Sequence, residues 1–252
     1  CQPPPQSAAV AAPPQPASSG GGGEDEPAAS KHAVQRIPLR ERSFREQALS
    51  AENLLLLTYF TIGALQCQFT VGSMGAQLER MGDADGAMIR YFGTCLALAC
   101  LWTPLLGNLT DRVGFLTTLT LTNSLLLVGT ACLLVPSLEL TYLSAILYAV
   151  GRVSLWALYF SYTAHVFGFR HFGKLAGCGL TVAACISLLQ YPLLYLCVRV
   201  LDGDFTVANA IFVALHGLAY GTLGRLGRGA REAALPMMPA RTAAAANEDP
   251  EE

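Results

Sequence analysis

Long apolar runs alternate with short polar connections through most of the chain. A helix needs about 20 apolar residues to cross a bilayer, and six runs meet this length. They cover residues 54–74, 87–106, 115–135, 140–162, 175–198 and 205–223. Each run is apolar around its whole circumference, and backbone groups in lipid must form hydrogen bonds within their own segment. The pattern therefore predicts an all-α integral membrane protein, with six transmembrane helices in a bundle over residues 53–224.

The composition supports a membrane protein and argues against nucleic-acid and metal partners. Only 13% of the 252 residues are charged, whereas a soluble domain carries about 25%. The net charge is −2 and no basic stripe is present, which argues against a nucleic-acid partner. The eight cysteines form no C-x-x-C pair and no metal-ligand spacing. We therefore expect packed cysteines, no metal or cofactor, and the lipid bilayer as the main partner.

The two flanks are polar and differ in character. Residues 1–35 are rich in Pro, Ala, Gly, Ser and Gln and cannot bury enough apolar surface to fold, which predicts a disordered cytoplasmic segment. Ser43 and Glu46 form a capping box within residues 36–52, where we expect a helix on the membrane surface or a solvated linker helix. Residues 225–252 are expected to be a cytoplasmic tail. The sequence begins at Cys1 without a signal-peptide pattern, so we expect a piece of a longer chain.

Basic residues concentrate on one side of the predicted bundle and set its orientation. The opposite side carries only Arg80, Arg90 and Arg199. The basic bias places both termini in the cytoplasm of a multi-pass protein, in the plasma membrane or an organelle membrane. Asn108 begins a glycosylation sequon that this orientation keeps in the cytoplasm. The basic residues on the cytoplasmic side are Lys31, Arg36, Arg40, Arg42, Arg45, Arg112, Arg170, Lys174, Arg225, Arg228, Arg231 and Arg241.

The connection LLGNLTDRVGFL between the second and third runs holds a charge pair. Gly107 and Gly114 suit a tight reversal between two helices. Asp111 can face the positive end of a neighbouring helix, and Arg112 can pair with an acid or a lipid phosphate. Such a cluster can hold two helix pairs together in one conformation and release them in another. The alternative is a tight turn with helix-capping residues.

This connection resembles the loop motif G-x-x-x-D-R-x-G of the major facilitator superfamily. The family pattern usually continues with basic residues, whereas this chain has Phe115, Leu116 and Thr117. GFRHFGKLAG at 168–177, LLQYP at 188–192 and SFREQ at 43–47 resemble the facilitative system-L-type neutral amino-acid carriers of that superfamily. The resemblance implies the C-terminal half of a twelve-helix fold, built as two inverted three-helix repeats. It also implies the N-terminal half of the same carrier as partner and an amino acid as solute.

Arg152 lies near the middle of the fourth run and is the most informative residue of the sequence. An arginine at that depth is costly unless it faces a water-filled cavity, an acid or the bundle interior. No Asp or Glu lies within any of the six runs, so a carboxylate of the solute is one partner and backbone carbonyls are the alternative. Tyr148, Trp156 and Tyr159 share its helix face and join the expected solute site, although such aromatic stripes also serve packing.

Three further polar residues are candidates for contact with a solute. Gln66 and Thr70 share one face of the first run, where they either line a cavity or join helices. Gln190 precedes Pro192, which frees a carbonyl one turn back and bends the fifth run into a possible gate. His216 in the sixth run has no acid beside it, and packing is the favoured interpretation over a proton relay.

The sequence thus favours transport of a small solute by alternating access. Two alternatives remain, a six-helix scaffold subunit and an intramembrane enzyme. The chain has no G-x-S-x-G, no H-E-x-x-H and no paired aspartates in the runs, which favours a protein that is not an enzyme.

Overall fold

The computed structural model of the chain describes residues 39–234, with side chains to residue 228. The expected disordered segment 1–35 and the last part of the expected tail lie outside these residues. Within the described range every regular element is a helix. The elements are η1 (Leu39–Glu41), α1 (Phe44–Ala48), α2 (Ala51–Arg80), α3 (Ala87–Leu98), η2 (Ala99–Trp102), α4 (Thr103–Val113), α5 (Phe115–Cys132), α6 (Leu138–Phe167), α7 (Phe172–Ser187), α8 (Gln190–Tyr195), η3 (Leu196–Val200) and α9 (Thr206–Ala234).

Six helical stretches of this part of the chain are long and apolar enough to cross a membrane. Four of them are the single helices α2, α5, α6 and α9, and two are broken helices that join α3 to α4 and α7 to η3. The predicted fold class, an all-α protein with six spanning helices, is confirmed.

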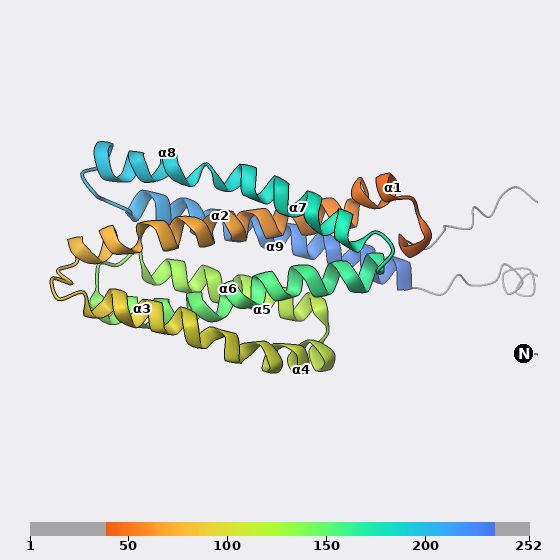
Figure 1. Cartoon of the computed structure of the whole chain (residues 1–252), viewed down its shortest axis with the longest axis horizontal. Helices are drawn as coiled ribbons and strands as arrows, with labels where there is room; N and C mark the ends of the chain where they lie inside the picture. Colours follow the sequence, from red (N-terminus) through yellow and green to blue (C-terminus); the bar gives the residue numbers. More distant parts are fainter. Residues whose placement is uncertain (1–38, 235–252) are drawn as a thin grey trace, which may run out of the picture. The chain divides into compact units, whose positions relative to one another are not determined.

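The six spans form two sets of three that pack against each other in equivalent ways. The first set is α2, α3–α4 and α5, and the second is α6, α7–η3 and α9. The second span of each set packs on the first span of the other, so α7 and α8 lie along α2 while α3 and α4 lie along α6 (Figure 1). The third spans, α5 and α9, pack on each other and on the first span of the opposite set. The helix contacts are therefore those of a structural repeat.

The two sets run in opposite directions. At one end, which we call the α1 end, the Gln47 side chain of α1 reaches the last turn of α6 at Phe167. At the other end, the α3 end, the Arg80 guanidinium closing α2 donates to the Asp202 carbonyl before α9. Because α2 begins at the α1 end and α6 begins at the α3 end, the equivalent helices point in opposite directions.

The second and fifth spans are the least covered by the rest of the chain. In their most apolar stretches 17% of residues are buried, against 56% in α2 and 50% in α6. The surface of these two spans carries exposed leucines and tyrosines, including Leu98, Leu101, Tyr191 and Tyr195. Apolar surface of this extent is stable only in contact with lipid or another apolar protein surface.

Several spans extend beyond their predicted ends, the second and the sixth the furthest. Residues 107–113, expected as a connection, continue α4 to Val113, and Gly114 alone separates α4 from α5. Gly114 has a φ of +85°, which favours glycine, and its N–H still bonds to the Thr110 carbonyl at 2.9 Å. At the other limit α9 runs to Ala234, past its predicted end at residue 223. Polar residues continue both helices because a helix that leaves the membrane keeps its own backbone hydrogen bonds.

The fifth span breaks one turn before Pro192, as the sequence predicted. Helix α7 ends at Ser187 and α8 begins at Gln190. Proline has no N–H for the Leu188 carbonyl, which instead accepts from Tyr191 at 3.1 Å in a tighter turn. The span then ends in a π-helical turn at η3.

The segment before α2 is fastened to the α1 end of the bundle. The predicted capping box is present, since Ser43 and Glu46 bond reciprocally at the start of α1. Gln47 is fully buried, and its amide donates to the Leu39 carbonyl at 2.8 Å and the Phe167 carbonyl at 3.3 Å. Arg40 donates to the His165 carbonyl. In place of one surface helix over 36–52, the described part of this segment therefore holds two short helices that pack on the bundle.

Glycines let the central helices approach closely. A Cβ on Gly151 of α6 would lie 2.8 Å from Cδ2 and 2.9 Å from Cγ of Leu126 in α5. Close by, the Ser144 hydroxyl donates to the Gly129 carbonyl across the same pair of helices at 2.7 Å. Helices in membranes associate through such close packing and hydrogen bonds because lipid removes most of the hydrophobic driving force.

Candidate functional site

Arg152 lies in the fifteenth position of the 30-residue helix α6. At about 1.5 Å per residue this is some 21 Å from the helix start, near the middle of the bilayer. The side chain is half-buried, and its Nε atom is buried without a hydrogen-bond partner among the described residues. A buried N–H that lacks a partner is unfavourable. The guanidinium therefore has unused hydrogen-bonding capacity at a depth where water is scarce.

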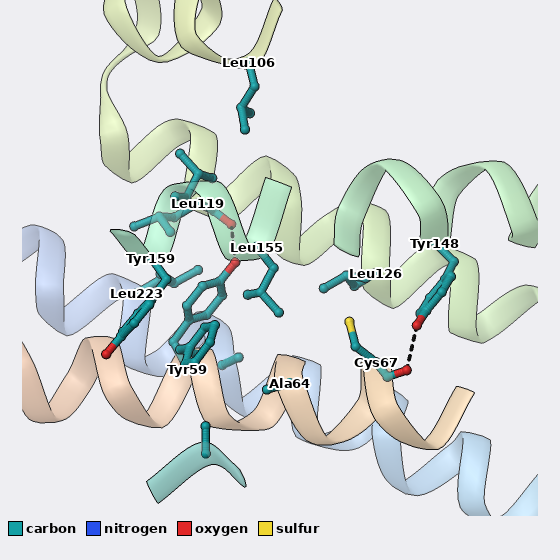
Figure 2. Close-up of a cluster of buried hydrophobic side chains, with 14 of the residues drawn as sticks. Tyr59, Ala64, Cys67, Leu106, Leu119, Leu126, Tyr148, Leu155, Tyr159 and Leu223 are labelled. Carbon is teal, nitrogen blue, oxygen red and sulfur yellow. Dashed lines mark hydrogen bonds between the residues drawn. The ribbon is translucent and has the colours of Figure 1, made fainter. Parts of the chain in front are cut away.

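The nearest polar neighbours of Arg152 come from α2 and from its own helix. Its charge interacts electrostatically with the Cys67 thiol and the Tyr148 hydroxyl. Tyr148 is 2% exposed and donates to the Cys67 carbonyl at 2.6 Å, as Figure 2 shows. This bond ties α6 to α2 beside the guanidinium. The phenol thus acts as a helix–helix link in this conformation, and none of these neighbours is an acid.

An aromatic cluster lies one to two turns along α6 from Arg152. The Phe60 ring of α2 stacks on Tyr159 with ring centroids 4.0 Å apart and meets the edge of Trp156 at 5.1 Å. Tyr159 is buried, whereas Trp156 is half-buried. Trp156 is therefore the member of the predicted aromatic set with its ring partly free. The sequence analysis missed Phe60, because it lies on another helix and helical spacing predicts neighbours within one helix only.

Gln190 does not meet Arg152 in this conformation. Its side-chain oxygen would lie 3.6 Å from a Cβ on Gly72, so the residue packs against α2 from α8. Gly72 and Cys67 are five residues apart, and at about 100° per residue they lie about 140° apart around α2. The structure thus places Arg152 and Gln190 on different sides of α2.

Gln66 and Thr70 face the interior of the bundle. With Ser73 and Gln77 they form a buried polar stripe at helical spacing along α2. The Gln66 amide donates to the Thr130 hydroxyl of α5 at 2.7 Å, and its oxygen lies 3.3 Å from Nε2 of His216 in α9. These groups join three helices rather than line a surface in this conformation, so we leave them outside the proposed solute site.

His216 has more than apolar packing around it. It is 1% exposed, and its Nδ1 atom lies 2.8 Å from the Asn123 side-chain oxygen. Asn123 in turn donates to the His216 carbonyl at 3.0 Å. The sequence analysis favoured a packing role for His216. The structure shows that His216 is buried and also takes part in a hydrogen-bond network.

The polar stripe of α2 reaches a cavity at the α3 end. Gln77 donates to Ser73 at 2.8 Å and accepts from Asn209 of α9 at 3.2 Å. Gln77 also lines a cavity of about 290 Å³ together with Arg80 and Asp204. The hydrogen bonds from Thr206 lower the pKa of Asp204, so this carboxylate at the start of α9 is charged at neutral pH.

The charged motif between the second and third spans lies at the α1 end. Asp111 and Arg112 are exposed in the last turn of α4, and neither side chain has a hydrogen bond or ion pair with the side chains described up to residue 228. Gly107 is also exposed, with open space where a Cβ would lie. The motif is therefore presented outward from the described bundle, and only Gly114 serves the reversal between α4 and α5.

The chain is similar to a curated membrane transporter. It is 27% identical over 175 residues to the equilibrative nucleobase transporter 1 of Bos taurus, a match that covers 60% of this chain and 36% of the relative. The chain thus spans well under half of that relative's length. No family model matches the sequence, and no solved structure matches it. Together with the six spanning helices, this similarity supports a multi-pass membrane protein.

Proposed function

We propose that the chain forms one of the two helical bundles of a major-facilitator carrier and that the solute passes between them by alternating access. The N-terminal half of the same carrier is the proposed partner. Three observations support this: the oppositely directed three-helix sets, the sparsely covered second and fifth spans, and the outward charged motif at Asp111 and Arg112. That motif would bind the partner bundle in one conformation only.

Arg152 is the observation that carries the proposal. Its guanidinium lies at mid-membrane, half-exposed, with Nε buried and without a partner among the residues described. A fork of N–H donors suits a planar group with adjacent acceptors. Trp156, half-buried against Phe60, offers an aromatic edge near the same depth.

We propose a planar heterocycle of the nucleobase class as the solute. Adjacent ring nitrogen and carbonyl acceptors match the arginine fork, and an aromatic neighbour suits a flat ring. The similarity to a relative named as a nucleobase transporter supports this class. An amino acid is the second candidate, because its carboxylate also suits Arg152. Its ammonium would need an acid, and no Asp or Glu lies within the middle of any described span.

Uptake measurements on the full-length protein distinguish these solutes. We expect cells that express it to accumulate radiolabelled guanine or hypoxanthine to equilibrium, with competition between the two bases and little competition from leucine. Leucine uptake that bases do not inhibit would favour the amino-acid carrier. Absence of both, with the protein at the cell surface, would favour the scaffold alternative.

The orientation gives a separate prediction at Asn108. Its side chain is exposed on α4 near the α1 end, and its amide donates to the Pro104 carbonyl at 3.1 Å. We propose that this end and both termini are cytoplasmic, so the sequon meets no glycosylation enzyme. Endoglycosidase treatment should leave the mobility of this region unchanged, and Asn108→Gln should do the same. A glycan on Asn108 would invert the proposed orientation.

A further inference from the structure

A buried hydrogen-bond network links α2, α5 and α9 through Gln66, Asn123 and His216. His216 is at its centre, with Nδ1 2.8 Å from the Asn123 oxygen and Nε2 3.3 Å from the Gln66 oxygen. Both partner atoms are amide oxygens, which accept hydrogen bonds and cannot donate them. A neutral imidazole has one N–H, so it can satisfy only one of these two oxygens.

The orientation of Asn123 is fixed by its second bond. Its amide nitrogen donates to the His216 carbonyl at 3.0 Å. Turning the amide over would place two oxygens against each other, with no hydrogen between them. The Asn123 oxygen therefore faces Nδ1 in every protonation state, and the shorter of the two ring contacts is an Nδ1–H donation.

The Gln66 end of the network has two possible polarities. In the observed one, the Gln66 amide nitrogen donates to the Thr130 hydroxyl at 2.7 Å, and that hydroxyl donates to the Leu126 carbonyl at 2.8 Å. The Gln66 oxygen then faces Nε2 and requires a proton on it. In the other polarity, the Thr130 hydroxyl donates to Gln66, whose amide nitrogen donates to an unprotonated Nε2. The observed arrangement thus fits an imidazolium, and the reversed one fits a neutral ring.

We propose that His216 binds a second ring proton within the bundle, with the side-chain oxygens of Asn123 and Gln66 as its two acceptors. Binding reverses the hydrogen bonds at Gln66 and Thr130 without moving a helix. Because the protonated ring donates to α5 and α2 at once, the proton ties α9 to both helices.

No charged group stands beside His216 to dictate its state. The helices packed most extensively on α9 are α2 and α5, and Cys197 of η3 packs in one apolar cluster with Phe212, one turn before His216. Tyr59 and Cys67 of α2 and Tyr220 of α9 are the titratable side chains in this interior, and none of them is an Asp, Glu, Lys or Arg. Tyr220 is paired with the Ser124 hydroxyl at 2.7 Å, and α5 carries no acid or base in its interior face. The two amide oxygens are therefore the groups that stabilise the cation.

The polar stripe of α2 gives the proton a route from the α3 end. The cavity lined by Arg80 and Asp204 reaches Gln77, which bonds Ser73 and Asn209. Thr70 lies between Ser73 and Gln66 at helical spacing on the same buried face. This row of polar side chains is the most polar path through the described interior between the cavity and His216.

Nitrogen NMR of the histidine rings tests this without any transport measurement. The full-length protein, labelled with ¹⁵N-histidine and embedded in lipid bilayers, is titrated from pH 8 to pH 4, and the signal lost in His216→Gln is assigned to His216. We expect a ring that carries its proton on Nδ1 at high pH and protons on both nitrogens at low pH. A His216 ring that stays neutral to the lowest pH at which the protein remains folded would overturn the proposal.

Variants at Gln66 test the acceptor role. The ratio of doubly to singly protonated His216 is compared with that of the unmodified protein at one acidic pH. It should fall about tenfold in Gln66→Met, which keeps the side-chain length but has no acceptor oxygen. It should rise in Gln66→Glu, which places a carboxylate at the same position. His165→Gln, an exposed residue at the end of α6, is the matched control and should leave the ratio unchanged. An unchanged ratio in both Gln66 variants would remove Gln66 as an acceptor and contradict the proposal, whatever the solute turns out to be.

Discussion

Arg152→Ala in the full-length protein should reduce uptake of the solute by about 10- to 150-fold while the protein still reaches the membrane. A hydrogen bond to a charged group contributes about 1.5–3 kcal/mol, which corresponds to this range. Arg152→Lys should lose most of this activity as well, because an ammonium keeps the charge without the planar fork of donors. Initial rates of radiolabelled uptake, normalised to surface protein, measure the effect.

The matched control is Arg199→Ala. Arg199 is exposed in η3 near the α3 end, and we expect its replacement to leave the uptake rate within about twofold of the unmodified protein. If both Arg152 variants transport normally, Arg152 is held by the protein for structural reasons and the solute site lies elsewhere. Loss of surface protein in both variants would also assign a structural role to Arg152.

Gly151→Val should clearly lower the stability of the protein. A Cβ at this position would lie 2.9 Å from Cγ of Leu126, a side chain that is 1% exposed and packed in the core. Overpacking of this kind costs about 1–3 kcal/mol, and the added branch of valine places the effect at the upper end of that range. We expect the melting temperature of the purified protein to fall by about 3–10 °C.

Gly93→Ala provides the comparison for Gly151→Val. Gly93 lies within α3, and nothing lies within 4 Å of the place where its Cβ would be. Alanine favours the helix over glycine by about 0.5–1 kcal/mol, so this change should preserve or slightly raise the melting temperature. Equal destabilisation by both substitutions would show that the α5–α6 contact is looser than the structure indicates.

The sequence predicted the features that depend on local chemistry. The capping box at Ser43 and Glu46 is present because it involves residues three positions apart, and the break before Pro192 follows from a missing N–H. The six spans could be predicted because each apolar run has about the 20 residues that a helix needs to cross a bilayer. Their ends were less predictable at α4 and α9, where polar residues continue a helix beyond the apolar region.

The direction in which a polar residue faces could not be predicted from one helix. Gln66 and Thr70 share a face, as their spacing indicates, but only the packing of α5 and α9 on α2 determines that this face is interior. Tyr148 lies one turn before Arg152 and shares its helix face, as the spacing predicts. Its hydroxyl nevertheless donates to the Cys67 carbonyl of another helix. Helical periodicity groups residues into faces, and the tertiary contacts decide which face meets which helix.

The fastening of Gln47 and Arg40 to the last turn of α6 has a practical consequence for protein engineering. A shortened recombinant protein that began at the first apolar residue would leave the His165 and Phe167 carbonyls without these donors and would uncover the corner where α6 meets α7. A shortened protein that keeps these contacts therefore starts no later than Leu39, and a fluorescent reporter inserted between Leu39 and Ala51 would disturb this corner even though it leaves every spanning helix intact.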